Sequence, residues 1–320
     1  MKIKKEVVIL VLLIAALSAY LLQRGQDRTR YTLPELPALA AADITQIEIA
    51  RGGEVVTLAR RDGRWLIEPQ GFAAAPKSVQ EMLSALSGLS LTALVSESKN
   101  YPLYELDDDN RIHVKAWQGE RLGRELDIGK VAPSFRHTFV RLAGDDRVYH
   151  ARDNFRFHFT GGPEELRNKS VLAFQRADIT EVEIRKGDLK AAFRREAGAA
   201  PEAAGERAAG AEESPAAWKR ADGAAADGGR LRQLIAELSD LQCERFLPDR
   251  DRSGLGRPIY ALALKGPAEH TLDIFAPAGQ DKSHPAASSQ SEQAFVLAED
   301  QAQRLMVDPQ ELLAPAAKAP

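Results

Sequence analysis

The stretch ADITQIEI, from Ala42 to Ile49, returns almost unchanged as ADITEVEI, from Ala177 to Ile184. The apolar and polar residues of both stretches alternate, which is typical of a β-strand with one buried face. Each stretch carries an acidic residue before its strand, and we expect this residue to mark the turn into the strand. The repetition predicts a duplicated fold that opens with this strand, and its apolar positions are Ile44, Ile47 and Ile49, matched by Ile179, Val182 and Ile184.

The sequence that follows the two stretches also corresponds. A second alternating run comes next, and then a strand with one tryptophan, Trp65 in the first copy and Trp218 in the second. Leucines and similar residues then recur at i, i+3, i+4 and i+7, starting at Val79 and at Leu231. This spacing predicts one amphipathic helix in each copy, with its apolar stripe facing a sheet. We therefore interpret both tryptophans as core residues beneath the helix and not as ligand platforms.

The later parts of the copies correspond more loosely. RELDIGK, around Asp127, resembles HTLDIFAP, around Asp273, and HTFVRLAGDDRVY resembles QAFVLAEDQAQRLM, where each predicts a strand, a polar turn and a strand. Each copy closes with a short helix that a proline opens, at Pro163 and at Pro309. Each copy is thus expected to hold three strands, one helix, about four strands and a short helix, which is an α+β module with a mainly antiparallel sheet.

The second copy carries a long stretch of Ala, Gly, Glu and Pro, which is too poor in bulky apolar residues to offset the entropy of ordering it. We interpret it as a disordered insertion, with a functional tether as the alternative. The predicted organisation is a tail and membrane anchor at residues 1–23, a linker at 24–40, the first repeat at 41–172, the second repeat at 173–314 with the insertion at 196–217, and a flexible tail at 315–320.

The N-terminal residues predict where the protein is located. After MKIKKE, the segment Val7 to Leu22 has sixteen residues without a charge. As a helix it would measure ~24 Å, slightly less than a ~30 Å hydrocarbon core, so it predicts a single transmembrane helix. The alternative is a cleaved signal peptide, since Leu17 to Ala19 is a small-residue pattern before Tyr20. The lysines before the segment favour a cytoplasmic N-terminus, and the body would then lie in the bacterial periplasm.

Composition excludes several classes of function. With 320 residues, a net charge of −3 and 6% aromatic residues, the chain predicts about two domains and no nucleic-acid partner. Cys243 is the only cysteine, so an internal disulfide is excluded. It occupies the position of Leu91 in the first copy, which favours a small core residue over a nucleophile.

Two groups of residues could bind a metal ion. Asp107 to Asp109 form an acidic run, but without the spacing of a calcium loop they favour a solvated turn. His150, Asp153 and His158 lie close in sequence, although their spacings match no zinc pattern. We expect the phenylalanines at 155, 157 and 159 to alternate inward on a strand, which would turn His158 outward. His113 and His137, in other alternating strands, are interpreted in the same way, as structural or surface residues.

Catalytic and phosphate-binding motifs are also missing from the sequence. Ser134 and Ser170 occur in polar connections and not in a G-x-S-x-G elbow. The glycine pairs at 52–53 and 161–162 lack the spacing of a phosphate loop and predict turns. The sequence therefore predicts no catalytic, cofactor-binding or metal-binding residue.

The order of these features resembles the domain of unknown function 4340 family of bacterial membrane-anchored proteins. The resemblance rests on the I-x-x-I-x-I strand, the DG-x-W strand, the helix ending in LSGL and the linker LRNKSVLAF-x-x-ADI, and it covers Leu33 to Leu313. It implies an accessory role at the inner membrane, since members tend to be encoded beside an uncharacterised ABC-type transport system akin to gliding-motility auxiliary proteins. The chain departs from the family's pattern at Tyr104 to Asp107, where the common form is Tyr-Gly-Leu and this chain has YELD, with Glu105 in place of the glycine.

Two hypotheses of different classes follow. The first is a membrane-anchored periplasmic interaction protein without catalytic activity, auxiliary to an ABC-type transport or envelope system, with partner-binding surface on one copy or along a strand edge. The alternative is an exported hydrolase or small-ligand-binding protein that uses a cleft between the two repeats.

Overall fold

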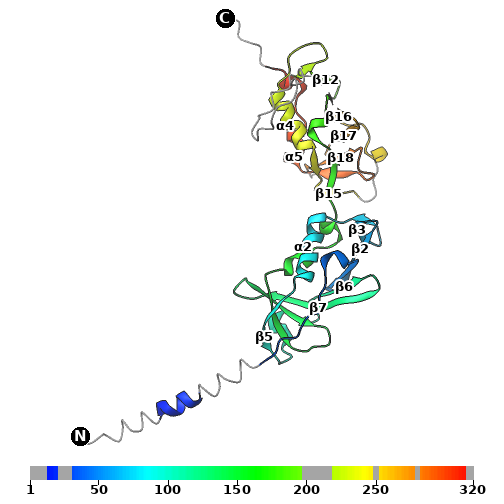
Figure 1. Cartoon of the computed structure of the whole chain (residues 1–320). Coiled ribbons are helices and arrows are strands. Elements are labelled where there is room, and N and C mark those ends of the chain that lie inside the picture. Colours follow the sequence, from blue (N-terminus) through cyan, green and yellow to red (C-terminus); the bar gives the residue numbers. More distant parts are fainter. Residues whose placement is uncertain (1–12, 21–30, 197–217, 248–251, 278–281, 315–320) are drawn as a thin grey trace, which may run out of the picture. The chain divides into compact units, whose positions relative to one another are not determined.

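The computed structural model describes residues 13–20, 31–196, 218–247, 252–277 and 282–314. The chain divides into two compact units, Met1–Asn168 and Lys169–Pro320 (Figure 1). Both are sheet-rich with few helices, so the α+β prediction is confirmed at this level.

The first unit is built on a nine-stranded sheet in which every neighbouring pair of strands is antiparallel. The strand that contains the opening phrase lies near its middle. In spatial order the strands are β4 (Phe72–Ala73), β3 (Arg64–Glu68), β2 (Glu54–Arg61), β1 (Gln46–Arg51), β6 (Ile112–Gln118), β7 (Arg121–Val131), β8 (His137–Leu142), β9 (Val148–Arg152) and β5 (Leu91–Ser96).

Helix α2 (Pro76–Ser87) covers one face of this sheet, as the sequence predicts. Pro76 opens it at a position where no backbone donor is needed, and Gly88 follows its last turn. The predicted stripe is buried and packs with the inward residues of the central strands in one core. Three short helical turns complete the unit: η1 (Ala41–Asp43), η2 (Tyr101–Tyr104) and η3 (Arg156–Phe159), together with α3 (Pro163–Leu166).

The second unit repeats this plan with an eight-stranded antiparallel sheet and helix α4 (Gly228–Leu238). Asp227 caps α4, because its carboxylate accepts hydrogen bonds from the backbone of Gly229 and Arg230. The strands in spatial order are β13 (Trp218–Arg220), β12 (Leu189–Arg195), β11 (Glu181–Lys186), β16 (Tyr260–Lys265), β17 (Glu269–Ile274), β18 (His284–Ser288), β19 (Phe295–Leu297) and β15 (Arg245–Phe246).

The repeated phrase forms the same substructure in both units. Its apolar residues are buried in β1 and β11, and the acids Asp43 and Asp178 lie in the turns η1 and η4 (Arg176–Asp178) that lead into these strands. Both strands pair with the following hairpin strand on one side and with a later strand on the other, β6 or β16. The sequence prediction of an opening strand and its turn is confirmed.

The boundary between the units falls before the predicted one. Residues 169–172, which the sequence places in the first repeat, belong to the second unit. They include most of β10 (Ser170–Ala173), which pairs with β14 (Asp240–Gln242) in a separate two-stranded sheet. Val171 and Leu172 are buried in the core of the second unit, and this burial explains the shift.

Two local predictions are wrong. The stretch QAFVLAEDQAQRLM contains one strand, β19, and then helix α5 (Glu299–Leu305), because Ala302 and Leu305 bury one helical face. The three phenylalanines at 155, 157 and 159 are not on a strand: they flank and occupy η3, where Phe155 and Phe159 are buried while Phe157 is 59% exposed.

The two tryptophans have different environments. Trp218 is buried in the core of the second unit, as expected. Trp65 is only half-buried at the edge of the first core. The expected equivalence therefore holds for their strands and not for the depth of their burial.

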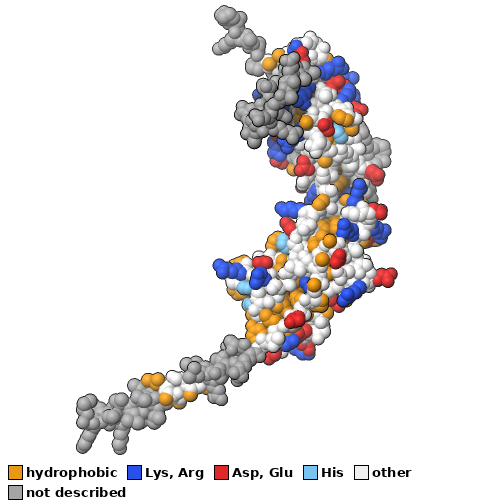
Figure 2. Space-filling model, viewed as in Figure 1, with side chains coloured by type: hydrophobic (Ala, Val, Ile, Leu, Met, Phe, Trp, Pro, Cys, Tyr) orange, Lys and Arg blue, Asp and Glu red, His pale blue; other side chains and the backbone are white. Residues whose placement is uncertain are grey.

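Much of the predicted membrane anchor at residues 7–22 lies outside the described residues. Residues 13–20 form a helix with exposed apolar side chains (Figure 2). In the described part of the chain, no helix has both the length and the apolar character needed to cross a membrane. The anchor stays a prediction, as do the insertion at 196–217 and the tail at 315–320, which lie almost wholly outside the described residues.

Candidate functional site

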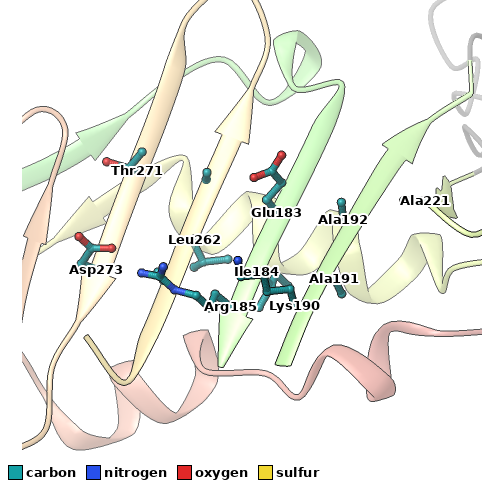
Figure 3. A pocket seen from close by; sticks show the side chains of 12 residues that line it. Glu183, Ile184, Arg185, Lys190, Ala191, Ala192, Ala221, Leu262, Thr271 and Asp273 are labelled. Carbon is teal, nitrogen blue, oxygen red and sulfur yellow. The ribbon is translucent and has the colours of Figure 1, made fainter. Parts of the chain in front are cut away.

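A groove of about 520 Å³ crosses the sheet of the second unit on the face turned away from α4, called the outer face below (Figure 3). Its floor is made of small side chains, Ala192 on β12 with Ala261 and Ala263 on β16. These residues point outward because the alternate residues of the same strands, such as Leu262, face the core. The groove exists where a sheet surface carries alanines in place of long side chains.

Charged side chains stand along the groove in two adjacent rows. In one row Glu183 lies opposite Ala263, which lies opposite Thr271. In the other row Arg185 lies opposite Ala261, which lies opposite Asp273. Figure 3 shows the Arg185 side chain extending over this row toward Asp273.

The two acidic residues of the groove lie in different surroundings. Lys265, two residues beyond Ala263, hydrogen-bonds the Glu183 carboxylate, and this contact lowers the pKa of Glu183. Lys265 also reaches Glu181 at 3.4 Å. Asp273 is only 7% exposed at the end of the row.

The basic residues of the groove are different. Arg185 and Lys190 are directly opposite each other on β11 and β12, and both are exposed. Within the described part of the chain, neither side chain has a hydrogen bond or an ion pair. One end of the groove therefore presents two adjacent cations to solvent.

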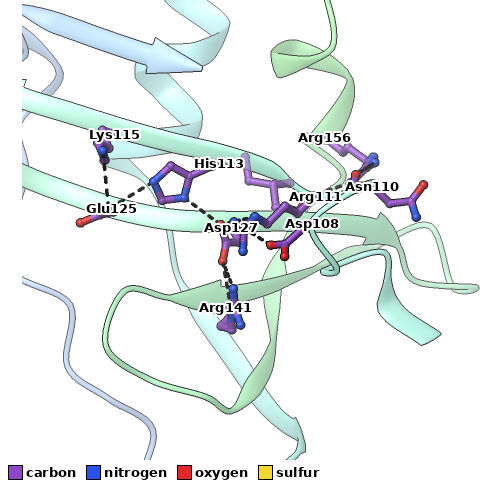
Figure 4. A network of polar contacts seen from close by, with 10 residues as sticks. Asp108, Asn110, Arg111, His113, Lys115, Glu125, Asp127, Arg141 and Arg156 are labelled. Carbon is purple, nitrogen blue, oxygen red and sulfur yellow. Dashed lines mark hydrogen bonds and ion pairs between the residues drawn. The ribbon is translucent and has the colours of Figure 1, made fainter. Parts of the chain in front are cut away.

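The first unit has a buried aspartate at the matched position, and there it is enclosed by basic side chains (Figure 4). His113 Nδ1 lies 2.8 Å from Asp127 Oδ1, and Arg141 donates to Oδ2 from Nε at 2.9 Å and from Nη2 at 2.6 Å. Arg111 Nε lies 3.7 Å from Oδ1. Asp127 is 7% exposed, the same as Asp273, so a carboxylate at this depth is a property of both copies.

The neighbouring row of the first unit is also filled by paired charges. Lys115 Nζ lies 3.6 Å from a carboxylate oxygen of Glu48 and 4.0 Å from one of Glu125. His113 Nε2 approaches the same Glu125 at 3.2 Å. Long side chains of opposite charge thus cover the outer face of the first sheet.

The strand registers give the exact correspondence between the two faces, since Asp127 lies opposite His113 as Asp273 lies opposite Ala261. The long cationic side chains of the first unit are replaced by smaller or uncharged ones in the second. The matched pairs are Arg111 and Ile259, His113 and Ala261, Lys115 and Ala263, and Arg141 and Ala287. Two of these pairs, His113 with Ala261 and Lys115 with Ala263, place an alanine of the groove floor where the first unit has a long side chain.

The described lining of the groove contains carboxylate, guanidinium, ammonium and hydroxyl groups, but no His, Cys or Ser side chain. Such groups can hold a ligand by charge and hydrogen bonding. The arrangement is that of a binding surface with an apolar floor and a few convergent polar groups.

The structure separates the residues that the sequence groups as metal candidates. Asp153 and His158 line a pocket of about 310 Å³ beside α2, where His158 Nδ1 lies 3.1 Å from Glu81. His150 instead packs against His137 and Phe139, at ring distances of 5.2 Å and 4.8 Å, and burial lowers the pKa of its imidazole. In the described residues, no three His, Cys, Asp or Glu side chains are placed to share a metal ion.

The remaining sequence candidates lie apart from the groove. Asp107 to Asp109 form a turn, in which Asn110 donates to Asp107 at 2.8 Å and Arg111 pairs with Asp108 at 2.8 Å. Ser134 lies on an exposed connection, 3.5 Å from His137 Nδ1, and Cys243 is buried in the second core. The residues of the groove were not among the sequence candidates. Comparing the outward residues of the two copies is the signal that would have found them.

Comparison with known protein families gives a match. The model of a family described as "Domain of unknown function (DUF4340)" matches residues 65–258, which is more than half of the chain. No curated protein and no solved structure matches the chain.

Proposed function

This chain belongs to the DUF4340 family, and on that premise we propose that it is an accessory protein without catalytic activity, which binds a partner protein of an ABC-type transport or envelope assembly. In this proposal the two sheet units stand in the periplasm, held at the inner membrane by residues 7–22. The partner binds at the groove of the second unit.

Location is supported by the sequence. The uncharged segment from Val7 to Leu22 follows three lysines, and this order favours an exported body behind a membrane anchor. The link to a transport system is what the family resemblance implies.

Partner binding is supported by one observation, the difference between the matched outer faces. The first sheet covers its buried aspartate with its own cationic side chains, whereas the second sheet carries alanines at the same places and leaves a groove. The outer face of the first unit is filled by its own side chains, and that of the second unit is open. This difference suits a structural role for the first unit and a binding role for the second.

The proposal is tested by affinity purification of the tagged full-length protein from detergent-solubilised bacterial membranes. We expect a transporter or envelope subunit to be recovered with the protein. A groove-filling variant, Ala261→His with Ala263→Lys, restores the residues of the first copy and should lose this subunit. The matched control is Val55→Lys, an exposed position on β2 of the first unit, which should retain it.

Equal recovery with the groove-filling variant and with the unmodified protein would contradict a partner at the groove. Recovery of no membrane or envelope subunit with the unmodified protein would contradict the accessory role itself. Circular dichroism of the variant establishes that it is folded before either result is interpreted.

A further inference from the structure

Resting on the proposed function, we infer that the groove binds an extended acidic segment of the partner protein, with carboxylates at Arg185 and Lys190 and main chain over the alanine floor. The partner segment that binds the groove is thus expected to be both extended and acidic. It follows from three features of the groove: its uncompensated charge, its floor and its length.

The first feature is the pair of cations. Like charges directly opposite on neighbouring strands destabilise a sheet, and Arg185 and Lys190 are such a pair. The matched residues of the first unit are Ala50 and Val55, which carry no charge. The cation pair therefore accompanies the open groove and is not required by the fold, whereas an anionic ligand would convert its repulsion into attraction.

The other charges that face the groove do not cancel this pair. Glu183 is engaged by Lys265, which is itself near Glu181. Arg185 extends toward Asp273, but Asp273 lies two strands away on β17 and is buried, and among the described residues no ion pair joins the two side chains. The exposed, unpaired charge of the groove is thus positive, although the whole chain has a net charge of −3.

The second feature is the floor. Alanine side chains let a main chain come close to the sheet, and the groove lies open along its length. At the matched positions the first unit has the His113 and Lys115 side chains in place of alanine. A guanidinium also matches the planar geometry of a carboxylate with two parallel hydrogen bonds.

The third feature is length. The lining runs from Ala221, just after β13, to Asp273 on β17, and so crosses five neighbouring strands. Strands lie ~4.8 Å apart, which gives a length of ~19 Å, and an extended chain covers ~3.3 Å per residue. A segment of about six residues therefore spans the groove, which fits an extended polypeptide better than a compact molecule.

The test uses full-length protein in detergent micelles and labelled octapeptides of alternating sequence, (Glu-Ala)4, (Gln-Ala)4 and (Lys-Ala)4, followed by fluorescence anisotropy. We expect (Glu-Ala)4 to bind about tenfold more tightly than (Gln-Ala)4, and (Lys-Ala)4 to bind most weakly. Arg185→Gln with Lys190→Gln should weaken binding of (Glu-Ala)4 about tenfold. The control Lys77→Gln with Arg121→Gln removes the same charge from exposed positions of the first unit and should leave binding unchanged.

Ala261→His with Ala263→Lys separates shape from charge. This variant adds cationic side chains to the groove but fills it, so we expect binding of (Glu-Ala)4 to fall at least tenfold. Unchanged or tighter binding would overturn the inference, because non-specific attraction to basic residues would then explain the result. Inorganic phosphate that displaces the peptide at equal concentration would also overturn it, as would an approximately tenfold gain in peptide affinity on removal of residues 197–217, which would make the chain itself the occupant.

The two proposals fail in different ways. If the groove-filling variant loses the partner subunit but (Glu-Ala)4 does not bind the unmodified protein, the acidic segment is wrong and the accessory role stands. If the peptide binds as expected and no subunit is recovered from membranes, the accessory role is wrong and the acidic preference of the groove stands.

Discussion

Asp127 and Asp273 are aspartates at matched strand positions of the two units, and both are 7% exposed. The side chains around them nevertheless differ. A carboxylate at this depth is costly unless charged or hydrogen-bonding groups surround it. In the first unit, the chain provides these groups on the outer face as His113, Arg111 and Arg141. The comparison shows how a few outward residues change a filled face into a groove while the core stays the same.

We expect Asp127→Asn to destabilise the first unit by about 3 kcal/mol, because it leaves the Arg141 guanidinium without its carboxylate partner in a largely buried site. Urea denaturation followed by circular dichroism measures the effect. Glu125→Gln is the control, since this carboxylate is more exposed and its pairs are longer, and its cost should stay below about 1 kcal/mol. Equal costs for the two variants would show that the Asp127 cluster adds nothing beyond a surface ion pair.

Because of the Tyr149 phenol, we expect the free energy of unfolding to fall in alkaline solution. Burial and, after it, the hydrogen bond to Asp145 at 2.7 Å together raise the pKa of this phenol to about 12. The unfolded pKa is about 10, so the neutral phenol stabilises the folded state fully below pH 10, and this contribution is lost between about pH 10 and 12.

Tyr149→Phe should therefore show a shallower fall in the free energy of unfolding between pH 9.5 and 11.5 than the unmodified protein, as measured by urea titration at each pH. Some fall remains in the variant because burial also raises the pKa of Tyr260. Tyr31→Phe, at an exposed tyrosine, is the control and should leave the slope unchanged. A slope that Tyr149→Phe does not alter would exclude this hydroxyl as the source.

At the scale of elements, spacing in the sequence predicts the long regular segments well. The stripe from Val79 and the stripe from Leu231 become α2 and α4, since apolar residues three and four apart can be buried together only on a helix. The opening strands follow for the same reason with a period of two. Duplication strengthens these predictions, because each pattern occurs twice.

Short elements could not be predicted in this way. The segments after β9 and after β19 both turn into helical structure, as η3 and α5, although the sequence was interpreted as a strand in each case. Both are too short for the two periods to differ clearly: Phe155 and Phe159 are buried four residues apart, and Ala302 and Leu305 three apart. The two segments follow strands that hold corresponding places in the two sheets, β9 and β19. This correspondence is visible only in the strand order of the folded protein.

The groove was missed for a different reason. Histidines, serines and the cysteine are the residue types that indicate reactive sites in a sequence, whereas the groove depends on Ala261 and Ala263. An alanine in a strand becomes informative only when the register places it opposite a charged residue. Glu105 shows the same limit at the backbone: it adopts a left-handed conformation, with φ of 53°, which ordinarily favours glycine.

For the whole molecule, the boundary at Asn168 makes a prediction about fragments. A fragment of residues 169–320 keeps β10, whereas a fragment of residues 174–320 lacks it and exposes the surface that Val171 and Leu172 cover. Burial of a large apolar side chain contributes about 1.5–3 kcal/mol, so we expect the shorter fragment, which lacks two of them, to be about 3–6 kcal/mol less stable. Thermal and urea denaturation of the two fragments give the difference.

Fragments of the first unit provide the control for this boundary. Residues 31–168 and residues 31–173 should unfold at the same urea concentration, since β10 belongs to the other unit. A first unit that gains stability from residues 169–173 would place the boundary where the sequence alone suggested.

The order of contacts along the chain also sets the order in which the units can fold during synthesis. The first unit is complete once Arg167 pairs with Ala74, so every partner has emerged by Asn168. The second unit is still incomplete until Leu313 reaches Ala226, and its first strand, β10, waits for β14. Strand pairing over long sequence separation is slow and leaves apolar edges exposed. Each unit therefore keeps apolar strand edges exposed until its last residues have emerged, and the first unit can already be folded while the second is being made.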